Sequence, residues 1–363
     1  MKVIVRGILD AKSQVIPSNA RNQGGGVWAE LPLLSPVRPR SDGDRLSILL
    51  LSYWDLCEIH YQLQQDINAT TPHRAISIVH GDNWIHYRYN YLATNETDMA
   101  FTTQLASEAD VIHINEYHNY RQIRTLAGHP RMVVHHHGVE YRKNWKFLEP
   151  LELDAGYTRL VSTFDLLEYS ECPETLLWLP SPIRINEIQR MFPHRPKGLK
   201  APWRIAHAAT IRANKGTDRF LTACASLQTK GLNIEPILIE NRQHAESLWM
   251  MSQCDVYFGS LFFDLGAASY EAMAIGMPVL CYTSDYALME WRKLYPRALP
   301  FQYVTADTLE AELERMIVDA NHWATMAARG EKHVKKYHDT KVVTKHVVSI
   351  YEATVPCKEL IKR

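Results

Sequence analysis

The sequence predicts an α/β protein built from two doubly wound, Rossmann-like domains that face each other across a cleft. Three observations predict it. Short runs rich in Val, Ile and Leu alternate with helical patterns along the chain, and a Pro-rich break near residue 195 separates two such series. The length of 363 residues and a hydrophobic content of 46% are enough for two separate cores.

Buried parallel strands read as continuous apolar runs bounded by polar turns. Before the break, such runs predict strands at residues 3–8, 46–51, 75–79, 111–114, 132–137 and 159–162. After it, they predict strands at 203–208, 234–239, 256–259, 278–282 and 299–304. The break, 192–202, is rich in Pro and basic residues and lacks periodicity. We therefore expect domains at 1–195 and 196–340, followed by a helix within 341–363.

Composition excludes several classes of protein. The formal net charge is zero, and neither half of the chain has the basic excess of a nucleic-acid-binding domain. The six cysteines lack CxxC spacing, which argues against a disulfide framework or a structural zinc. No apolar run approaches the length of a membrane span, and residues 1–8 read as a strand rather than a signal peptide. We expect a cytoplasmic protein, with a peripheral position at the inner face of a membrane left open.

Two segments of the second half carry the chemistry. The segment 264–280 reads as a Gly-containing loop, a short helix that carries Glu271, and a buried strand. A carboxylate near a helix start can accept hydrogen bonds from a ribose, and the free N–H groups of that helix suit a phosphate. About 50 residues upstream, the segment 207–217 places Arg212 and Lys215 just before a helix. Together they favour a nucleotide site.

These two motifs, in this order and at this spacing, resemble the C-terminal domain of GT-B glycosyltransferases, the retaining family 4 group most closely. The resemblance is good over residues 200–350 and weaker before 195. It implies that the C-terminal domain binds a nucleotide-sugar and that the N-terminal domain binds the acceptor. It also implies that the last helix, within 341–363, crosses back to the N-terminal domain.

The resemblance assigns a donor site in the C-terminal domain. Arg212 and Lys215 would neutralise the leaving diphosphate, and Glu271 would bind the ribose. The family has a first Glu where this chain has Phe263, so Asp264 is the candidate for the sugar contact. The adjoining loop would present backbone N–H groups from Leu265, Gly266 and Ala267.

The N-terminal half has a second Gly-rich segment, 23–30. Three glycines before a helical pattern let the backbone approach a ligand closely. The resembled enzymes have such a loop between the first strand and the first helix, so Gly25 and Gly26 are donor-binding candidates. The insertion at 10–22 would lie close to the same site.

Three consecutive histidines end the strand predicted at 132–137. Alternate residues of a strand point to opposite faces, so His136 cannot join His135 and His137 in one simple metal site. We therefore expect no metal. The resemblance makes His137, before Gly138, the residue that contacts the donor sugar, and we count it with Arg212 and Lys215 as catalytic.

Acceptor-side candidates follow from strand ends. Ligands of parallel α/β sheets bind at the carboxyl ends of strands. Asn115, Glu116 and His118 follow the strand at 111–114, and Arg142 follows the histidines. A stretch of interleaved Arg, His, Tyr and Trp at 117–146 could also contact bases of a nucleic acid.

We therefore expect a hexosyltransferase that moves a sugar from a UDP- or GDP-linked donor to an acceptor hydroxyl with retention, in glycan or polysaccharide synthesis, without a cofactor. Glycan, lipid-linked and DNA acceptors all remain open. One alternative is a phage-type enzyme that glucosylates hydroxymethylated DNA bases. Another is a non-transferase enzyme of nucleotide-sugars, such as an epimerase of the same architecture. The sequence does not reveal the base, the sugar or the oligomeric state.

Overall fold

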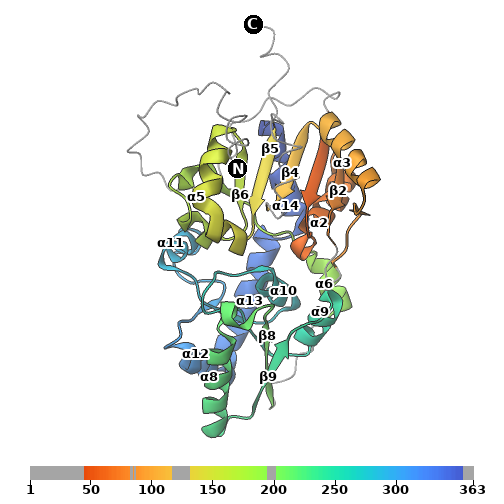
Figure 1. Ribbon diagram of the computed structural model, residues 1–363. Helices are drawn as coiled ribbons and strands as arrows, with labels where there is room; N and C mark the ends of the chain where they lie inside the picture. Colours follow the sequence, from red (N-terminus) through yellow and green to blue (C-terminus); the bar gives the residue numbers. More distant parts are fainter. Residues whose placement is uncertain (1–44, 82–84, 86, 117–130, 194–201, 355–363) are drawn as a thin grey trace.

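The computed structural model describes residues 45–354, apart from 82–84, 86, 117–130 and 194–201. Within that part, two parallel β-sheets form the centres of two domains, with one domain above the other in Figure 1. The predicted α/β class with two doubly wound units is confirmed. The first predicted strand, 3–8, the Gly-rich segment with Gly25 and Gly26, and His118 lie outside the described residues.

The N-terminal sheet has seven strands, in the order β3-β2-β1-β4-β5-β6-β7. All of its pairs are parallel. Strand β1 is central and reads Ser-Ile-Leu-Leu-Leu-Ser, an apolar run because helices cover both faces of the sheet. Since the chain winds outward from β1 in both directions, the sheet is doubly wound. Its strands are β1 (Ser47–Ser52), β2 (Arg74–Val79), β3 (Tyr91–Leu92), β4 (Val111–Asn115), β5 (Met132–His136), β6 (Thr158–Val161) and β7 (Leu176–Trp178).

Helical segments connect these strands. The connection after β1 consists of residues 53–55, a short 3-10 turn and α2, and Asp55 accepts hydrogen bonds from the N–H groups of His60 (2.9 Å) and Tyr61 (2.7 Å) in the first turn of α2. Helix α3 begins with a capping box of Asn95 and Asp98. The helical segments are η1 (Leu56–Glu58), α2 (Ile59–Thr70), α3 (Glu96–Glu108), α5 (Val139–Asp154), η2 (Phe164–Glu168), η3 (Pro173–Thr175) and α6 (Ile185–Met191).

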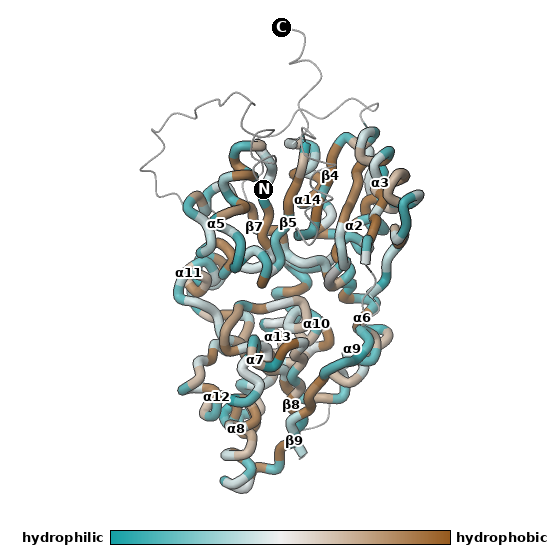
Figure 2. The backbone as a smooth tube through the Cα atoms, viewed as in Figure 1, coloured by the Kyte–Doolittle hydropathy of each residue, from teal (hydrophilic) through white to brown (hydrophobic). Residues whose placement is uncertain are grey.

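The C-terminal sheet has five parallel strands in the order β12-β11-β10-β8-β9. Its strands are β8 (Trp203–Ala208), β9 (Ile234–Ile239), β10 (Val256–Phe258), β11 (Val279–Cys281) and β12 (Gln302–Tyr303). The helices are α7 (Arg212–Lys215), α8 (Thr217–Thr229), α9 (His244–Ser252), α10 (Ala267–Ile275), α11 (Asp285–Leu294), α12 (Leu309–Val318), α13 (Ala320–Tyr337) and α14 (Thr340–Thr354). Figure 2 shows hydrophobic stretches along strands in the interior of both domains.

The chain crosses between the domains at the end of α13. The backbone N–H of Ile183 donates to His338 O (2.6 Å), and the N–H of Thr340 donates back to Ile183 O (3.3 Å). Helix α14 then packs against α2, with Val343, Val347 and Tyr351 in the core of the N-terminal domain (Figure 1). The Tyr351 hydroxyl lies 2.6 Å from His113 Nδ1 of β4, which fixes the helix to the sheet.

Two strands escaped sequence analysis. Strand β3 has two residues and β7 has three, and both form the edges of the seven-stranded sheet. Neither lies in a run that contains Val or Ile, the signal that marked the other strands: β3 is Tyr-Leu and β7 is Leu-Leu-Trp. No helix in the described part of the chain is long and apolar enough to cross a membrane.

Candidate functional site

Segments that follow strands of the two sheets meet between the domains. The ring of Phe164, just after β6, lies 5.0 Å from that of Trp291 in α11, and one apolar cluster includes residues of both domains. Near the other edge, the backbone N–H of His244 donates to Ile85 O (2.9 Å). The predicted site residues therefore sit at a packed interface between rigid sheets.

Lys215 is a half-buried member of the predicted donor site. It ends α7, and its ammonium donates to Ala208 O (2.9 Å) at the end of β8. Burial lowers its pKa, with Cys281 and Cys57 as opposing electrostatic neighbours. An ammonium has three N–H donors, and Ala208 O is its single hydrogen-bond acceptor among the described residues. Two donors therefore remain for a ligand oxygen.

Gly216 explains why Lys215 can lie there. Its φ of 75° is left-handed, which ends α7 and starts α8 without the cost a side chain would impose. A Cβ at this position would also come within 3.0 Å of Leu261 Cβ in the loop after β10. The backbone N–H of Leu261 in turn donates to Lys215 O (3.2 Å). Gly216 thus lets the turn that carries Lys215 pack against the loop that follows β10.

Arg212 lies differently from Lys215. It is exposed, and its guanidinium makes a bidentate pair with Glu240 after β9, with Nε and one terminal nitrogen 2.8 and 2.7 Å from the carboxylate oxygens. A phosphate would therefore have to compete with Glu240 for this side chain. Its contact with a diphosphate stays a prediction.

Glu271 is buried in α10, in the middle of the helix rather than at its start, and it has a partner that the sequence did not reveal. His244 Nε2 lies 2.7 Å from Glu271 Oε1, and His244 Nδ1 lies 3.6 Å from Glu58 Oε1 of the N-terminal domain. Desolvation opposes a charge here, but the carboxylates of Glu271 and Glu58 outweigh it and raise the pKa of His244 to about 10. A charged imidazole thus joins the two domains.

Arg88 completes this inter-domain group. Its guanidinium pairs with the carboxylate of Glu58 (2.7 Å). Desolvation alone would raise the pKa of Glu58, but hydrogen bonds from His244 and Arg88 outweigh it and lower the pKa of Glu58 to about 2. A cavity of about 170 Å³ adjoins the group, lined by Glu58, Arg88, His244 and Glu271. The carboxylate predicted to bind a ribose therefore reaches a cavity between the domains.

The predicted sugar loop contacts the N-terminal domain through Phe263. The guanidinium carbon of Arg142 lies 4.4 Å from the centre of the Phe263 ring, and Arg142 also pairs with Asp165 (2.5 Å). This chain thus has a cation–π contact at the position where the resembled family has its first Glu. Arg142 thus bridges the domains at the loop predicted to bind the sugar, and its contact with an acceptor stays a prediction.

Asp264, beside Phe263, is buried and accepts hydrogen bonds from Trp291 Nε1 (3.0 and 3.2 Å). Burial, with Asp165 as the nearest like charge, raises its pKa well above the ordinary value. Its carboxylate is held within the protein, and its sugar contact stays a prediction. Leu265 is buried, whereas Gly266 is exposed at the N-cap of α10 and Ala267 begins the helix.

The predicted N-terminal residues come together at the ends of β4 and β5. His137 Nε2 lies 3.0 Å from Asn115 Oδ1, and its backbone N–H donates to Glu116 Oε1 (2.9 Å). Glu116 has a φ of 50°, an uncommon conformation for a residue other than glycine, so its backbone is strained. Adjacent strands thus place Asn115, Glu116 and His137 in one group, as expected from the sheet topology.

A column of imidazoles runs inward from His137. The ring centroids of His137 and His135 are 4.0 Å apart, those of His135 and His113 are 5.5 Å apart, and those of His113 and His60 are 4.7 Å apart. Burial lowers the pKa of His60, His113 and His135, which keeps these rings neutral. No group of His, Cys, Asp or Glu side chains that could hold a metal ion occurs within the described ranges.

Sequence reasoning missed Glu58 and His244. Both follow strands, β1 and β9, and polar residues after a strand in an α/β sheet are a signal for a site. The sequence predicts a first strand at 3–8 and a Gly-rich loop at 23–30, which lie outside the described residues. Within the described sheet, residues 53–55 and η1 connect β1 to α2.

Solved structures with a similar fold include glycosyltransferases. HepE of Anabaena, in complex with UDP and glucose, has a TM-score of 0.62 at 15% identity. An alpha-glucosyltransferase in complex with UDP and a 13-mer DNA has a TM-score of 0.61 at 11% identity. In both comparisons the match covers 85% of this chain and 100% of the other. A glycosyltransferase of Rickettsia africae has a TM-score of 0.60 at 11% identity, with 86% and 99% covered.

Comparison of the sequence with family models and with curated proteins finds no match. The structural likeness therefore speaks for the fold: this chain has the two-domain GT-B architecture that its sequence predicted.

Proposed function

We propose that this protein is a glycosyltransferase of the retaining, family 4-like type, which transfers a hexose from a nucleoside diphosphate sugar to an acceptor hydroxyl in glycan or polysaccharide synthesis. One observation carries the proposal. In a GT-B fold, Lys215 and the buried carboxylate of Glu271 follow the neighbouring parallel strands β8 and β10, so both lie at the carboxyl-terminal edge of the C-terminal sheet.

The chemistry follows from these positions. The bond between the anomeric carbon and the diphosphate breaks, and the diphosphate leaves with the bonding electrons. Lys215 stabilises the negative charge that develops, more strongly than in water because burial removes the solvent that would screen it. A bond forms between the acceptor oxygen and the same face of the anomeric carbon, and the acceptor proton passes to a diphosphate oxygen. Side chains supply the positive charge, so no metal is required.

The test is a donor-hydrolysis assay with UDP- and GDP-linked hexoses in the presence of a chelator. Release of the nucleoside diphosphate, undiminished by chelation, is the expected result. Loss of activity that Mn²⁺ or Mg²⁺ restores would contradict metal independence. Formation of an epimeric nucleotide-sugar without release would favour an epimerase. Adding glycan, lipid-linked or hydroxymethylated DNA acceptors then identifies the acceptor class by which one accelerates release.

Replacing Lys215 with methionine keeps the length of the side chain and removes the charge. We expect binding of the nucleoside diphosphate to weaken by about 1.5–3 kcal/mol, because a charge-assisted hydrogen bond is lost. Calorimetry on the wild type and the variant measures it. Arg219→Ala removes an exposed charge from the neighbouring helix α8 and should leave the affinity unchanged. Equal affinities of Lys215→Met and the wild type would exclude a phosphate role for Lys215.

Replacing His137 with alanine tests the sugar end of the site. His137 belongs to the N-terminal domain, whereas Lys215 and Glu271 belong to the C-terminal one. We therefore expect His137→Ala to lower kcat by about tenfold or more while nucleotide affinity changes little. Steady-state kinetics and nucleotide titration on one preparation give both numbers. Equal losses in turnover and nucleotide affinity would contradict a specific role at the sugar.

A further inference from the structure

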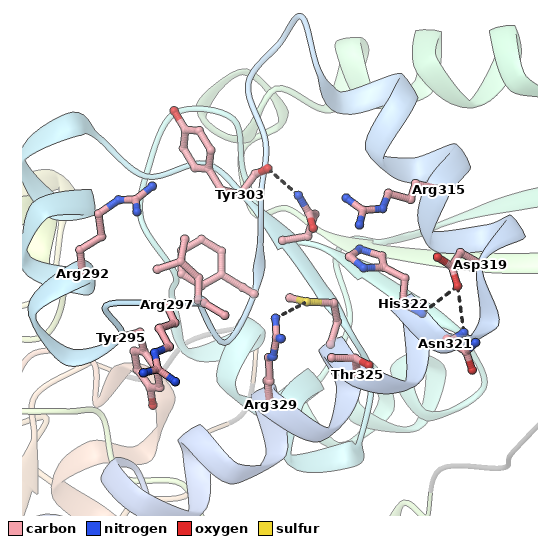
Figure 3. A pocket seen from close by; sticks show the side chains of 15 residues that line it. Arg292, Tyr295, Arg297, Tyr303, Arg315, Asp319, Asn321, His322, Thr325 and Arg329 are labelled. Carbon is pink, nitrogen blue, oxygen red and sulfur yellow. Dashed lines mark hydrogen bonds between the residues drawn. The ribbon is translucent and has the colours of Figure 1, made fainter.

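A cavity of about 500 Å³ lies in the C-terminal domain, away from the residues described above. Its walls come from the end of α11 and the segment after it, from β12, and from α12 and α13 (Figure 3). Neither Lys215 nor Glu271 lines it. Strand β12 is the edge strand of the sheet, at the opposite edge from β9, which precedes His244. We call this cavity the arginine pocket.

Four arginines line the arginine pocket: Arg292, Arg297, Arg315 and Arg329. They come from separate elements, and Figure 3 shows their side chains around the same hollow. The one acidic residue among the lining residues is Asp319. The lining therefore carries three positive charges in excess, although the formal net charge of the whole chain is zero.

These arginines are poorly neutralised by the protein. Arg315 lies 3.8 Å from Glu312, a long contact for an ion pair. Asp319 uses Oδ1 to cap α13, where it accepts hydrogen bonds from the backbone N–H groups of Asn321 (3.1 Å) and His322 (3.0 Å). Within the described ranges, Arg292, Arg297 and Arg329 have no carboxylate at ion-pair distance. Like charges gathered without counter-charges repel, so this arrangement is most stable when an anion joins it.

His322 adds a further donor to the arginine pocket. Its Nε2 is buried and has no hydrogen-bond partner among the described residues. Its ring lies among Arg315 and Arg329, whose charges, after desolvation, lower its pKa. A buried ring nitrogen without a partner costs free energy, and a bound phosphate oxygen would supply one. The pocket thus has an unsatisfied polar group as well as unneutralised charge.

The chemistry of the lining selects the ligand. The planar fork of a guanidinium matches two phosphate oxygens, and arginine is the side chain best suited to bidentate recognition of phosphate. A phosphate monoester has a charge of about −1.5 to −2 at neutral pH, so an excess of three positive charges matches about two such groups. A volume of about 500 Å³ is within the range of small-molecule sites. The rings of Tyr295 and Tyr303 supply an apolar wall for the rest of the molecule.

We propose that the arginine pocket is a second ligand site of this protein, which binds a molecule carrying two phosphate groups and is separate from the inter-domain site. The same chemistry is offered by a free metabolite with two phosphates and by a phospholipid whose headgroup carries a second phosphate. The proposal does not depend on the proposed glycosyltransferase activity.

The probe is inorganic pyrophosphate, which is titrated into the full chain and followed by calorimetry. Saturating UDP is present throughout, so that the proposed nucleotide site is already occupied. Arg297→Ala and Arg329→Ala should each weaken binding about tenfold or more, the loss that follows from one charge-assisted hydrogen bond. Lys215→Met and Arg219→Ala should leave the affinity for pyrophosphate unchanged. All of the substituted arginines are exposed, so the variants should keep the melting temperature of the wild type.

A second arm separates the two sources of phosphate. Phosphatidylcholine vesicles with and without phosphatidylinositol 4-phosphate, which carries two phosphates, are sedimented with the protein. Sedimentation that requires phosphatidylinositol 4-phosphate, is lost in Arg297→Ala and Arg329→Ala and is competed by pyrophosphate identifies a lipid headgroup. Pyrophosphate binding without sedimentation identifies a soluble ligand. Failure of pyrophosphate to bind the wild type, or equal binding by the wild type and both pocket variants, would overturn the proposal.

Discussion

Lowering the pH from about 7 to about 5 is expected to unfold this protein, because it buries neutral histidines. Among the described residues, six histidines have no exposed surface: His60, His113, His135, His207, His333 and His338. Desolvation is the main cause that lowers the pKa of each, to about 3 for His113 and His338 and to about 4 for His207. In the unfolded chain the same side chains titrate near pH 6.5.

The sign of the effect follows from proton uptake. Below about pH 6.5 the unfolded chain binds protons at these histidines and the folded chain does not, so each costs about 1.4 kcal/mol of stability per pH unit. Burial acts oppositely on two carboxyls, raising the pKa of Asp55 to about 7 and that of Asp264 in the same direction. As the pH falls, the folded chain therefore takes up about two protons, at Asp55 and Asp264, that the unfolded chain does not. The six histidines of the unfolded chain take up about six, so unfolding binds about four protons in all. This corresponds to a loss of about 5 kcal/mol of stability per pH unit, against a total stability of about 5–15 kcal/mol.

Urea unfolding at a series of pH values measures this dependence. His338→Asn is the informative variant, because an amide at that position can keep the hydrogen bond that His338 Nδ1 makes with Ser181 O (2.9 Å) but cannot take up a proton. Its stability should fall less steeply with acid, by about 1.4 kcal/mol per pH unit, whatever its stability at neutral pH. A wild-type stability that stays flat from about pH 7 to about pH 5 would show that these histidines become protonated in the fold.

Replacing His244 with alanine is expected to destabilise the protein by about 3 kcal/mol or more at neutral pH, because it leaves the buried carboxylates of Glu58 and Glu271 without their shared cation. His244→Gln keeps a neutral donor and should lose less. Because Glu271 is the carboxylate proposed to bind the donor ribose, nucleotide affinity should change as well. Denaturant unfolding and nucleotide titration on the same variants measure the two effects.

The pH dependence of this variant identifies the charge as the cause. The folded pKa of His244, about 10, lies above its unfolded value near 6.5. The charge of His244 therefore stabilises the folded state fully below about pH 6.5, and this stabilisation is lost as the pH rises towards 10. The difference in stability between wild type and His244→Ala should shrink over this range. A difference that stays constant with pH would mean that His244 stabilises through packing, as in its ring contact with Tyr87.

Most of the strands could be located in the sequence, because parallel strands that are covered on both faces consist of continuous apolar runs. Strands β1, β4 and β8 all appear within a residue or two of their predicted bounds. The edge strands β3 and β7 were not predicted, because neither lies in an apolar run that contains Val or Ile. Lys215 before Gly216 was also readable, because a basic residue, a glycine and a helix start form a local pattern.

The partners of the site residues were decided by tertiary structure alone. Sequence analysis placed Arg212 beside Lys215, yet Arg212 pairs with Glu240 and Lys215 turns to Ala208 O. Nor did the sequence show that Arg142 contacts Phe263 of the other domain.

The physical reason is the distance along the sequence over which each sequence pattern acts. Hydrophobic periodicity and turn chemistry act over a few residues, so the sequence by itself determined the order of the elements, the two domains and the strand ends where polar residues collect. The ion pair between Glu58 and His244 joins residues of different domains, and it depends on how the two sheets face each other. The arginine pocket likewise draws on four separate elements whose charges are unremarkable along the chain. Only the packed structure brings those charges together.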